Sequence, residues 1–166
     1  SDKLDPGKVC ILGCGNGYDA ILFSKKGFYV TAVDFAETPI HNLKNNAMSL
    51  SLSIETIKKD IFDLTPGYSS QFDYIIEQTC FCAIDPLKRK QYSDLVYDLL
   101  KVGGKLVGLW MPLDKDINEG GPPFGVKEDE IKVLFSNKWK ITEDYFPNQS
   151  IEARKGREKL IVFEKL

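Results

Sequence analysis

Short apolar runs alternate with segments of helical spacing along most of this sequence. The runs are β-rich and about as long as a strand, and they span residues 8–12, 29–33, 53–58, 72–76 and 105–111. Segments whose apolar residues recur with the period of a helix span residues 19–26, 37–50, 86–100 and 127–135. Strand, helix and strand in repeated succession are typical of an α/β fold, in which helices cover both faces of a parallel sheet.

The C-terminal part of the sequence departs from this alternation. Residues 112–125 contain three glycines and three prolines, and a loop of this length usually serves as a lid or a binding loop. Two more strand-like runs, 139–146 and 159–165, have no convincing helical segment between them, so we expect an antiparallel hairpin at one edge of the sheet. The sequence has no internal repeat or low-complexity tract, and residues 1–166 are predicted to form a single domain.

Charge and hydropathy exclude several classes of partner. The net charge of −2 provides no basic surface for a nucleic acid, and no apolar run approaches the ~20 residues of a membrane span. The N-terminus lacks the layout of a signal peptide. We therefore expect a cytoplasmic monomer that acts on a small molecule and binds neither nucleic acid nor membrane.

The four cysteines, Cys10, Cys14, Cys80 and Cys82, are spaced C-x3-C and C-x-C. Structural zinc sites typically use C-x2-C pairs, and the single histidine, His41, is distant in the sequence and is predicted to be structural. A disulfide would need an oxidising compartment. Small buried thiols are therefore favoured over a metal site or a disulfide, and Cys14 is predicted to be a small packing residue and not a nucleophile.

The first apolar run enters a turn, GCGNG at residues 13–17, with a glycine at every second position. Glycine adopts positive φ without strain and lets a ligand approach the backbone closely, and the N-terminus of the next helix offers free N–H groups. Dinucleotide-binding turns have the spacing G-x-G-x-x-G, but the residue at position 18 is Tyr18. The spacing G-x-G-x-G favours a ligand that places a sugar and an amino acid beside the turn.

Two carboxylates stand at the ends of the next two strands. Asp34 can accept hydrogen bonds from both hydroxyls of a ribose, and Asp60 can bind an adenine amino group. Ile61 and Phe62 can flank the ring. Since the carboxyl ends of parallel strands meet at one edge of a sheet, these side chains and the turn 13–17 are predicted to form a nucleoside pocket. S-adenosylmethionine fits this pocket best.

Longer stretches run in one order over nearly all of the chain: GCGNGYD, VDFAETPI, KKDIFDLTP, FDYIIEQTCFCAIDPLKRKQY, LLKVGGKL, GGPPFGVKEDEI and ARKGREKL. In these stretches the chain resembles the thiopurine S-methyltransferase superfamily of class I methyltransferases, and most closely its thiol, thiocyanate and halide methyltransferase branch. The resemblance implies a Rossmann-like three-layer sandwich. Its mostly parallel seven-stranded sheet would have the order 3-2-1-4-5-7-6, with strand 7 antiparallel.

The resemblance also implies S-adenosylmethionine as the cofactor and S-adenosylhomocysteine as the product. By position, the cofactor-binding residues would be Gly13, Gly15, Asp34, Asp60, Ile61, Glu77, Gln78 and Thr79. The implied acceptor is a small soft nucleophile, in the first place a thiol. Such an acceptor needs little or no general base because the sulfonium already activates the methyl group, so no catalytic residue is assigned. Candidates for the acceptor site are Phe81, Trp110, Met111, Phe124 and Arg154.

Departures from the family bear on the acceptor. Gln78 and Met111 stand where the plant thiol methyltransferases have tyrosines. The family's N-terminal segment, which covers the cofactor with tryptophans, is expected to be absent because this sequence begins at the first strand. A core position for Trp110 is an open alternative. For Arg154, and for Arg157 as a second cation that could attract an anion, a solvated surface position is the alternative.

Two other functions also remain open. One is a nicotinamide-dependent oxidoreductase on the same fold, which Tyr18 in place of a third glycine and the GGPPF motif disfavour. The other is a protein that binds an adenosyl ligand without turnover. Titration with S-adenosylmethionine and with NAD separates the first alternative from a methyltransferase, and a turnover assay separates the second.

Overall fold

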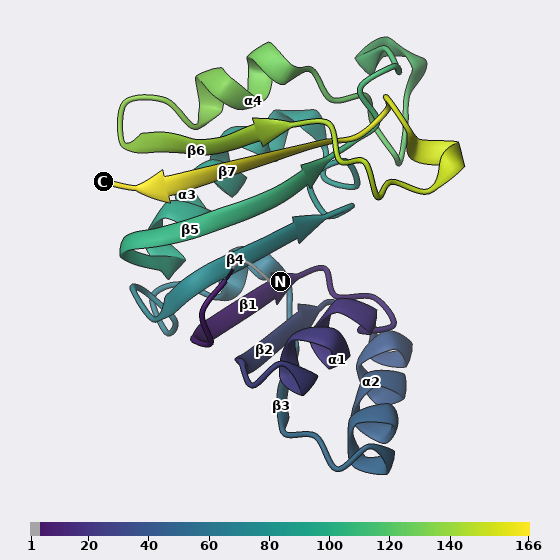
Figure 1. Cartoon of the computed structure of the whole chain (residues 1–166), viewed down its shortest axis with the longest axis vertical. Coiled ribbons are helices and arrows are strands. Elements are labelled where there is room, and N and C mark those ends of the chain that lie inside the picture. The colour runs from purple at the N-terminus through teal and green to yellow at the C-terminus, as the bar shows by residue number, and fades with distance from the viewer. Residues whose placement is uncertain (1–3) are drawn as a thin grey trace.

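The computed structural model describes residues 4–166, and the seven strands found there form one sheet in the order β3-β2-β1-β4-β5-β7-β6 (Figure 1). The strands are β1 (Lys8–Leu12), β2 (Tyr29–Asp34), β3 (Ile54–Lys58), β4 (Phe72–Gln78), β5 (Leu100–Trp110), β6 (Trp139–Tyr145) and β7 (Lys159–Lys165). β7 runs antiparallel to its neighbours β5 and β6, and the other neighbouring strands are parallel. The predicted strand order and the edge hairpin are therefore confirmed.

The helices cover the two faces of the sheet. They are α1 (Tyr18–Lys25), α2 (Glu37–Ser49), α3 (Arg89–Leu99) and α4 (Glu128–Leu134). Figure 1 shows α1 in front of the sheet near β1 and β2, α2 next to α1 on the right of β3, and α3 behind the sheet. Successive side chains of a strand point to opposite faces, so Val9 and Ile11 pack in the cluster of Phe23 on α1. Cys10 and Leu12 pack in the larger cluster with residues of α3 and α4.

One predicted boundary was wrong. The fifth strand, expected over residues 105–111, begins five residues earlier, at Leu100, and Gly103 and Gly104 lie inside it. The register of β4 and β5 shifts between the pair Phe72–Leu100 and the pair Tyr74–Lys105, so the glycine pair lies in a local irregularity of the ladder. β3 ends at Lys58. Asp60 therefore follows that strand and caps a short 3-10 helix, η1 (Ile61–Asp63).

The fold brings the ends of β1, β2 and β4 to one edge of the sheet, on the right in Figure 1. The glycine turn 13–17 follows β1 at this edge, and Asp34 is the last residue of β2. Among residues 4–166, no helix has the length and apolar character that crossing a membrane requires.

Candidate functional site

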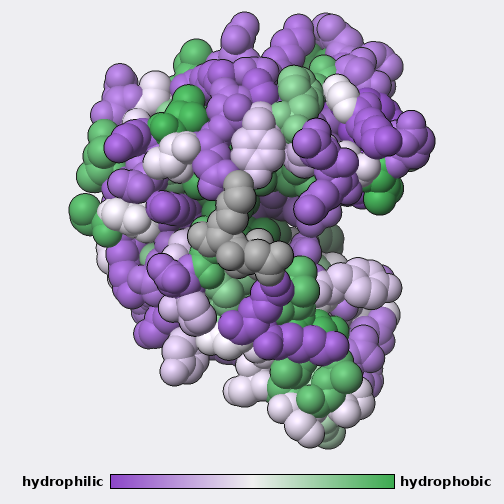
Figure 2. Space-filling view, in the orientation of Figure 1, coloured by the Kyte–Doolittle hydropathy of each residue, from purple (hydrophilic) through white to green (hydrophobic). Residues whose placement is uncertain are grey.

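Two adjoining cavities lie at the carboxyl edge of the sheet, and both are bordered by Gly13 and Thr79. The first, here called the β2–β3 cavity, has a volume of about 330 Å³ and is bordered by Asp34, Asp60 and Ile61. The second, the glycine-turn cavity, has a volume of about 250 Å³ and follows the turn 13–17. Figure 2 shows the surface hollowed on this side, between the half with β5–β7 and the half with α1 and α2. The combined space is of the size that small-molecule ligands occupy.

The glycines of the turn have different physical reasons to be glycine. Gly17 has a φ of +76°, and a Cβ built on it would lie 2.4 Å from the side chain of Leu43, so α1 and α2 leave no room for a side chain there. Gly15 also has positive φ, +49°, but its Cβ would meet no atom within 4 Å. Gly15 borders the glycine-turn cavity, so the space beside it is open to a ligand.

Asp34 holds the glycine turn in place. One carboxylate oxygen, Oδ2, accepts the backbone N–H of Gly15 at 2.9 Å, and Oδ1 accepts that of Ala36 at 2.9 Å. The residue is 8% exposed, so it is more buried than a solvated strand end. A carboxylate has about four acceptor positions, and two of them remain for a ligand in the β2–β3 cavity.

The next strand ends complete the border of the two cavities. Asp60 is exposed and accepts the backbone N–H of Phe62 at 3.0 Å, which orients the carboxylate at the N-terminus of η1. Ile61 is buried beside it and borders the same cavity. Gln78 borders the glycine-turn cavity. Thr79 has a φ of +67°, which is strained for a β-branched residue, and such strain concentrates at functional sites.

Glu77 differs from the other predicted cofactor-binding residues because it borders neither cavity. It is 2% exposed, and its carboxylate points inward, where it accepts the backbone N–H of Phe81 at 2.9 Å and the hydroxyl of Tyr92 at 2.5 Å. Burial raises the pKa of Glu77 to about 7, although these hydrogen bonds act in the opposite direction.

The candidates for the acceptor site fall into three groups. Phe81 and Trp110 are each 1% exposed, and their rings pack edge to face with centroids 5.2 Å apart, so the alternative of a core position holds for Trp110. Met111 and Phe124 are half-buried and border neither cavity. Arg154 does border the glycine-turn cavity, at the end of the 3-10 helix η4 (Glu152–Arg154).

Two predicted side chains lie elsewhere. Arg157 pairs with Asp114 at 2.7 Å on the surface, which is the solvated alternative. His41 is exposed on α2, where Asn45 contacts its ring at 3.0 Å. The loop 112–125 is nevertheless tied to the site, because the backbone N–H of Phe124 donates to the carbonyl of Cys82 at 2.7 Å.

All four cysteines are free thiols, and Cys10, Cys80 and Cys82 are buried. Cys14 is partly buried beside Asp34, and burial followed by the charge of Asp34 raises its thiol pKa to about 12. Burial likewise raises the pKa of Cys82 to about 11 and that of Cys80 well above its ordinary value. These thiols are protonated at neutral pH, so none of them is an activated nucleophile. Within residues 4–166, no three metal-ligating side chains group together.

We expect Cys14 to resist alkylation in the folded protein. A thiol whose pKa rises from 9.0 to about 12 holds a far smaller thiolate fraction at pH 8, so its reaction with iodoacetamide should be at least about a hundredfold slower than in denaturant. Mass spectrometry of the labelled peptides measures both rates. Labelling of Cys14 at the same rate in the native and the denatured protein would contradict this assignment.

Two charged residues at or near the site were not predicted from the sequence. Asp19, at the start of α1, borders the glycine-turn cavity, and burial raises its pKa. Arg89 is 1% exposed and pairs with Glu130, with the shortest contact at 2.8 Å, beneath the ring of Phe81. Arg89 and Tyr92 lie on the same apolar stripe of α3. A charged residue on an apolar stripe is unusual, and this signal in the sequence could have identified Arg89.

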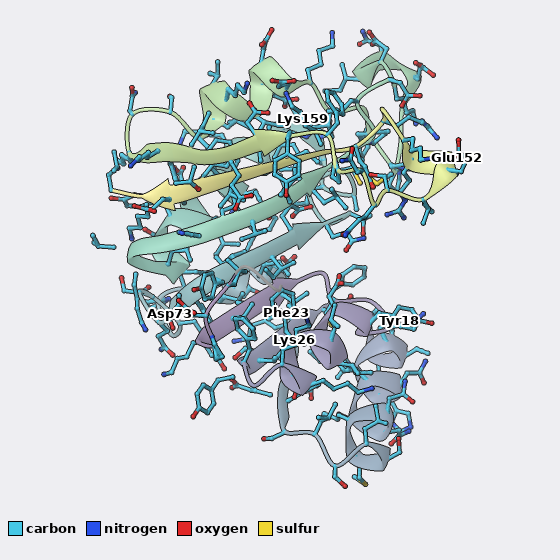
Figure 3. All side chains as sticks on the ribbon, in the orientation of Figure 1. Tyr18, Phe23, Lys26, Asp73, Glu152 and Lys159 are labelled. Carbon is cyan, nitrogen blue, oxygen red and sulfur yellow. The ribbon has the colours of Figure 1, made fainter. Side chains whose placement is uncertain are left out.

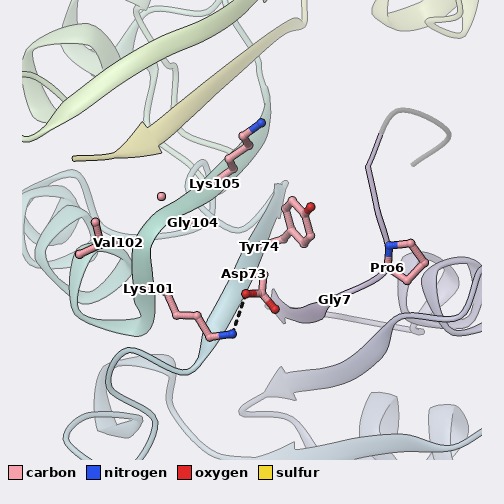
Figure 4. Close-up of a pocket in the computed structure, with 9 residues that line it drawn as sticks. Pro6, Gly7, Asp73, Tyr74, Lys101, Val102, Gly104 and Lys105 are labelled. Carbon is pink, nitrogen blue, oxygen red and sulfur yellow. Dashed lines mark hydrogen bonds and ion pairs between the residues drawn. The ribbon is translucent and has the colours of Figure 1, made fainter.

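Another cavity, of about 390 Å³, lies at the opposite edge of the sheet (Figure 4). It is bordered by Asp73, which pairs with Lys101 at 2.6 Å, and by the glycine pair 103–104. Figure 3 shows how far apart the two edges lie, since Tyr18 marks the carboxyl edge and Asp73 the other. The cavity is thus separate from the strand ends that carry ligand-binding chemistry in open α/β sheets.

The chain is similar to proteins of known activity. The family model described as thiopurine S-methyltransferase matches residues 1–165. A probable thiol methyltransferase 2 of Arabidopsis thaliana is 30% identical over 161 residues, covering 95% of this chain and 70% of the relative. A thiocyanate methyltransferase 1 of Brassica oleracea is 30% identical, covering 100% of this chain and 73% of the relative. A thiopurine S-methyltransferase of Pseudomonas fluorescens is 28% identical, with coverages of 82% and 68%.

Solved structures agree on the fold. A SAM-dependent methyltransferase of Methanosarcina mazei superposes with a TM-score of 0.84 at 18% identity, covering 99% of this chain and 95% of the other. A SAM-dependent methyltransferase of Clostridium acetobutylicum superposes with a TM-score of 0.80 at 16% identity, with coverages of 99% and 86%. At these identities the likeness shows the architecture alone.

Proposed function

Because the chain belongs to the thiopurine S-methyltransferase family, we propose that it transfers a methyl group from S-adenosylmethionine to a small thiol. The observation that carries this proposal is the edge of the sheet where Gly15, Asp34 and Asp60 border two joined cavities. The similarity to thiol, thiocyanate and thiopurine methyltransferases supports the choice of acceptor. We keep the expectation, drawn from the sequence, of a cytoplasmic monomer.

The residues at the site suit the parts of the cofactor. The carboxylate of Asp34 accepts the ribose hydroxyls, and Asp60 accepts from the adenine amino group while Ile61 packs on the ring. The open side of Gly15 admits the methionine part against the backbone. Asp19 borders the same cavity, and its carboxylate is complementary to the ammonium of that part.

The chain's own task in the reaction is to position the reactants and exclude water. S-adenosylmethionine supplies a methyl group that its sulfonium already activates. An aryl thiol ionises near neutral pH without help, and Arg154 at the glycine-turn cavity provides a positive charge that attracts the thiolate. Holding the two reactants in line can lower the barrier by several kcal/mol. The protonated thiols of Cys14 and Cys80 do not compete with the acceptor.

We expect thiols to be better acceptors than halides. The resemblance implies that Met111 replaces a tyrosine of the plant thiol methyltransferases, so an acceptor site that includes it would have one fewer hydroxyl to replace the hydration of a small anion. A panel of an aryl thiol, a thiopurine, hydrosulfide, thiocyanate and iodide with radiolabelled S-adenosylmethionine measures kcat/KM for each. The expected order is thiols, then thiocyanate, then iodide. A kcat/KM for iodide equal to that for the aryl thiol would overturn this assignment of the acceptor.

A further inference from the structure

Glu77 is a buried carboxylate that the proposed reaction does not use. It precedes Gln78, the last residue of β4, and Thr79, which follows that strand. Both of those residues border the glycine-turn cavity, whereas Glu77 itself is 2% exposed and turned away from it. A buried carboxylate is costly unless its oxygens are hydrogen-bonded. Its partners therefore indicate what it does.

The two oxygens of Glu77 connect the site to α3. Oε1 accepts the backbone N–H of Phe81 at 2.9 Å, and Oε2 accepts the hydroxyl of Tyr92 at 2.5 Å. Phe81 belongs to the loop of residues 79–83 that follows β4, here called the β4 loop. One carboxylate thus holds the middle of the β4 loop against α3, and both of its partners are donors.

The β4 loop forms one wall of the β2–β3 cavity. Thr79, Cys80 and Ala83 border that cavity, and Thr79 has the strained φ of +67°. A Cβ built on Gly13 would lie 3.1 Å from Cys80 Sγ, so the loop packs directly on the glycine turn. A change in the position of the loop would therefore change the shape of both cavities.

The titratable groups around Glu77 come from three elements. Tyr92 faces it from α3, and Cys80 and Cys82 face it from the β4 loop. Cys10, on β1, interacts with Tyr92 and Cys80 and is buried. Burial raises the pKa of every one of these thiols and of the phenol, so all of them stay protonated near neutral pH. Arg89 lies against Phe81, with its guanidinium 4.6 Å from the ring centroid.

We propose that Glu77 is a positioning residue whose ionised carboxylate holds the β4 loop in the conformation that binds the adenosyl ligand, an inference that rests on the proposed function. Protonation removes the negative charge that strengthens both hydrogen bonds, and the backbone N–H of Phe81 cannot accept the new O–H, although the hydroxyl of Tyr92 can. The hold of the carboxylate on the β4 loop is then weaker. Because the pKa of Glu77 is about 7, ligand affinity should fall as the pH drops through neutrality, and binding should release a proton.

Unfolding in acid would not explain such a fall. The pKa of Glu77 is higher in the folded protein than its ordinary value of 4.5, so the folded state holds this proton more tightly than the unfolded state. The contribution of this residue to the free energy of unfolding is therefore fully present at low pH, and it is lost as the pH rises toward about 7. Between pH 8 and pH 6 the residue therefore affects stability and ligand affinity in opposite directions.

Isothermal titration with S-adenosylhomocysteine from pH 6 to pH 8 tests the proposal. For the wild type we expect the Kd to rise about tenfold toward pH 6, as a pKa of about 7 implies when binding requires the ionised form. Glu77→Gln should bind more weakly and with a Kd independent of pH. Glu55→Gln is the matched control, because Glu55 accepts from Thr31 at 2.8 Å and Tyr68 at 3.0 Å, away from both cavities, and it should keep the wild-type profile.

The possible failures are distinguishable. A wild-type Kd that is flat over this range, or a Glu77→Gln variant that keeps the wild-type slope, would overturn the role of Glu77 while leaving the ligand intact. No heat of binding at any pH would instead overturn the proposed function. If Glu77→Gln does not fold, wild-type titrations at pH 7 in two buffers of different ionisation enthalpy should show release of about half a proton, and no release would overturn the proposal.

Discussion

Replacing Gly15 with alanine should raise the Kd for S-adenosylhomocysteine on the order of a hundredfold, because the added methyl group displaces the ligand from the backbone. Nothing in the protein would clash with this methyl group, since its Cβ position has no neighbour within 4 Å. The positive φ of +49° adds a stability cost of about 1–2 kcal/mol. Isothermal titration and thermal unfolding of the same sample separate the two effects.

Gly27 provides the control for the backbone strain in this experiment. Its φ is +84°, and a Cβ built on it also meets nothing within 4 Å, but it lies between α1 and β2, at the edge of the sheet opposite the cavities. Gly27→Ala should therefore lose similar stability and keep the wild-type Kd. Equal affinity of the Gly15→Ala and Gly27→Ala variants would show that no ligand occupies the space beside Gly15.

Asp34→Asn is expected to weaken both the fold and the ligand. The carboxylate accepts N–H groups from Gly15 and Ala36, and the amide nitrogen of asparagine would face one of them. Losing a hydrogen bond to a charged acceptor costs about 1.5–3 kcal/mol, so we expect a Kd at least about tenfold higher. For a chain of this size, each kcal/mol of lost stability lowers the Tm by about 2–4 °C.

Asp73→Asn is the matched control for this variant. Asp73 also accepts two N–H donors, the backbone of Lys8 at 2.8 Å and the ammonium of Lys101 at 2.6 Å, but at the opposite edge of the sheet. The Asp73→Asn substitution should lower the Tm and leave the Kd for S-adenosylhomocysteine unchanged. A folded Asp34→Asn variant with the wild-type Kd would mean that the ribose does not bind at the end of β2.

Much of the fold could be predicted from local pattern. The period of the apolar residues predicted the strands and helices, and the lack of a helix between the last two strands predicted their hairpin. The error in the start of the fifth strand has a physical cause at Gly103 and Gly104. Glycines signal a turn in most sequences, but here β5 passes through them because Leu100 pairs with Phe72 beyond the irregularity.

The site residues that lie at the ends of strands could be predicted from the sequence. The direction in which individual side chains point was harder to predict. Gly15, Asp34 and Asp60 lie at or shortly after the ends of strands, so topology alone brings them together. Phe81 was proposed for the acceptor site and lies in the core. Glu77 was proposed for cofactor binding and points inward. Both directions depend on contacts with Tyr92 on α3, and the local pattern of the sequence does not specify how α3 packs.

Transfer of a radiolabelled methyl group from S-adenosylmethionine to an aryl thiol is the most direct test of the account. Thermal unfolding with S-adenosylhomocysteine at a hundred times its Kd, which should add about 2.7 kcal/mol of stability, establishes that the sample is competent to bind. The account predicts labelled thioether from the wild type and from Gly27→Ala, and a severe loss with Gly15→Ala. A folded wild-type protein that binds the ligand and yields no labelled product with any acceptor of the panel would contradict it.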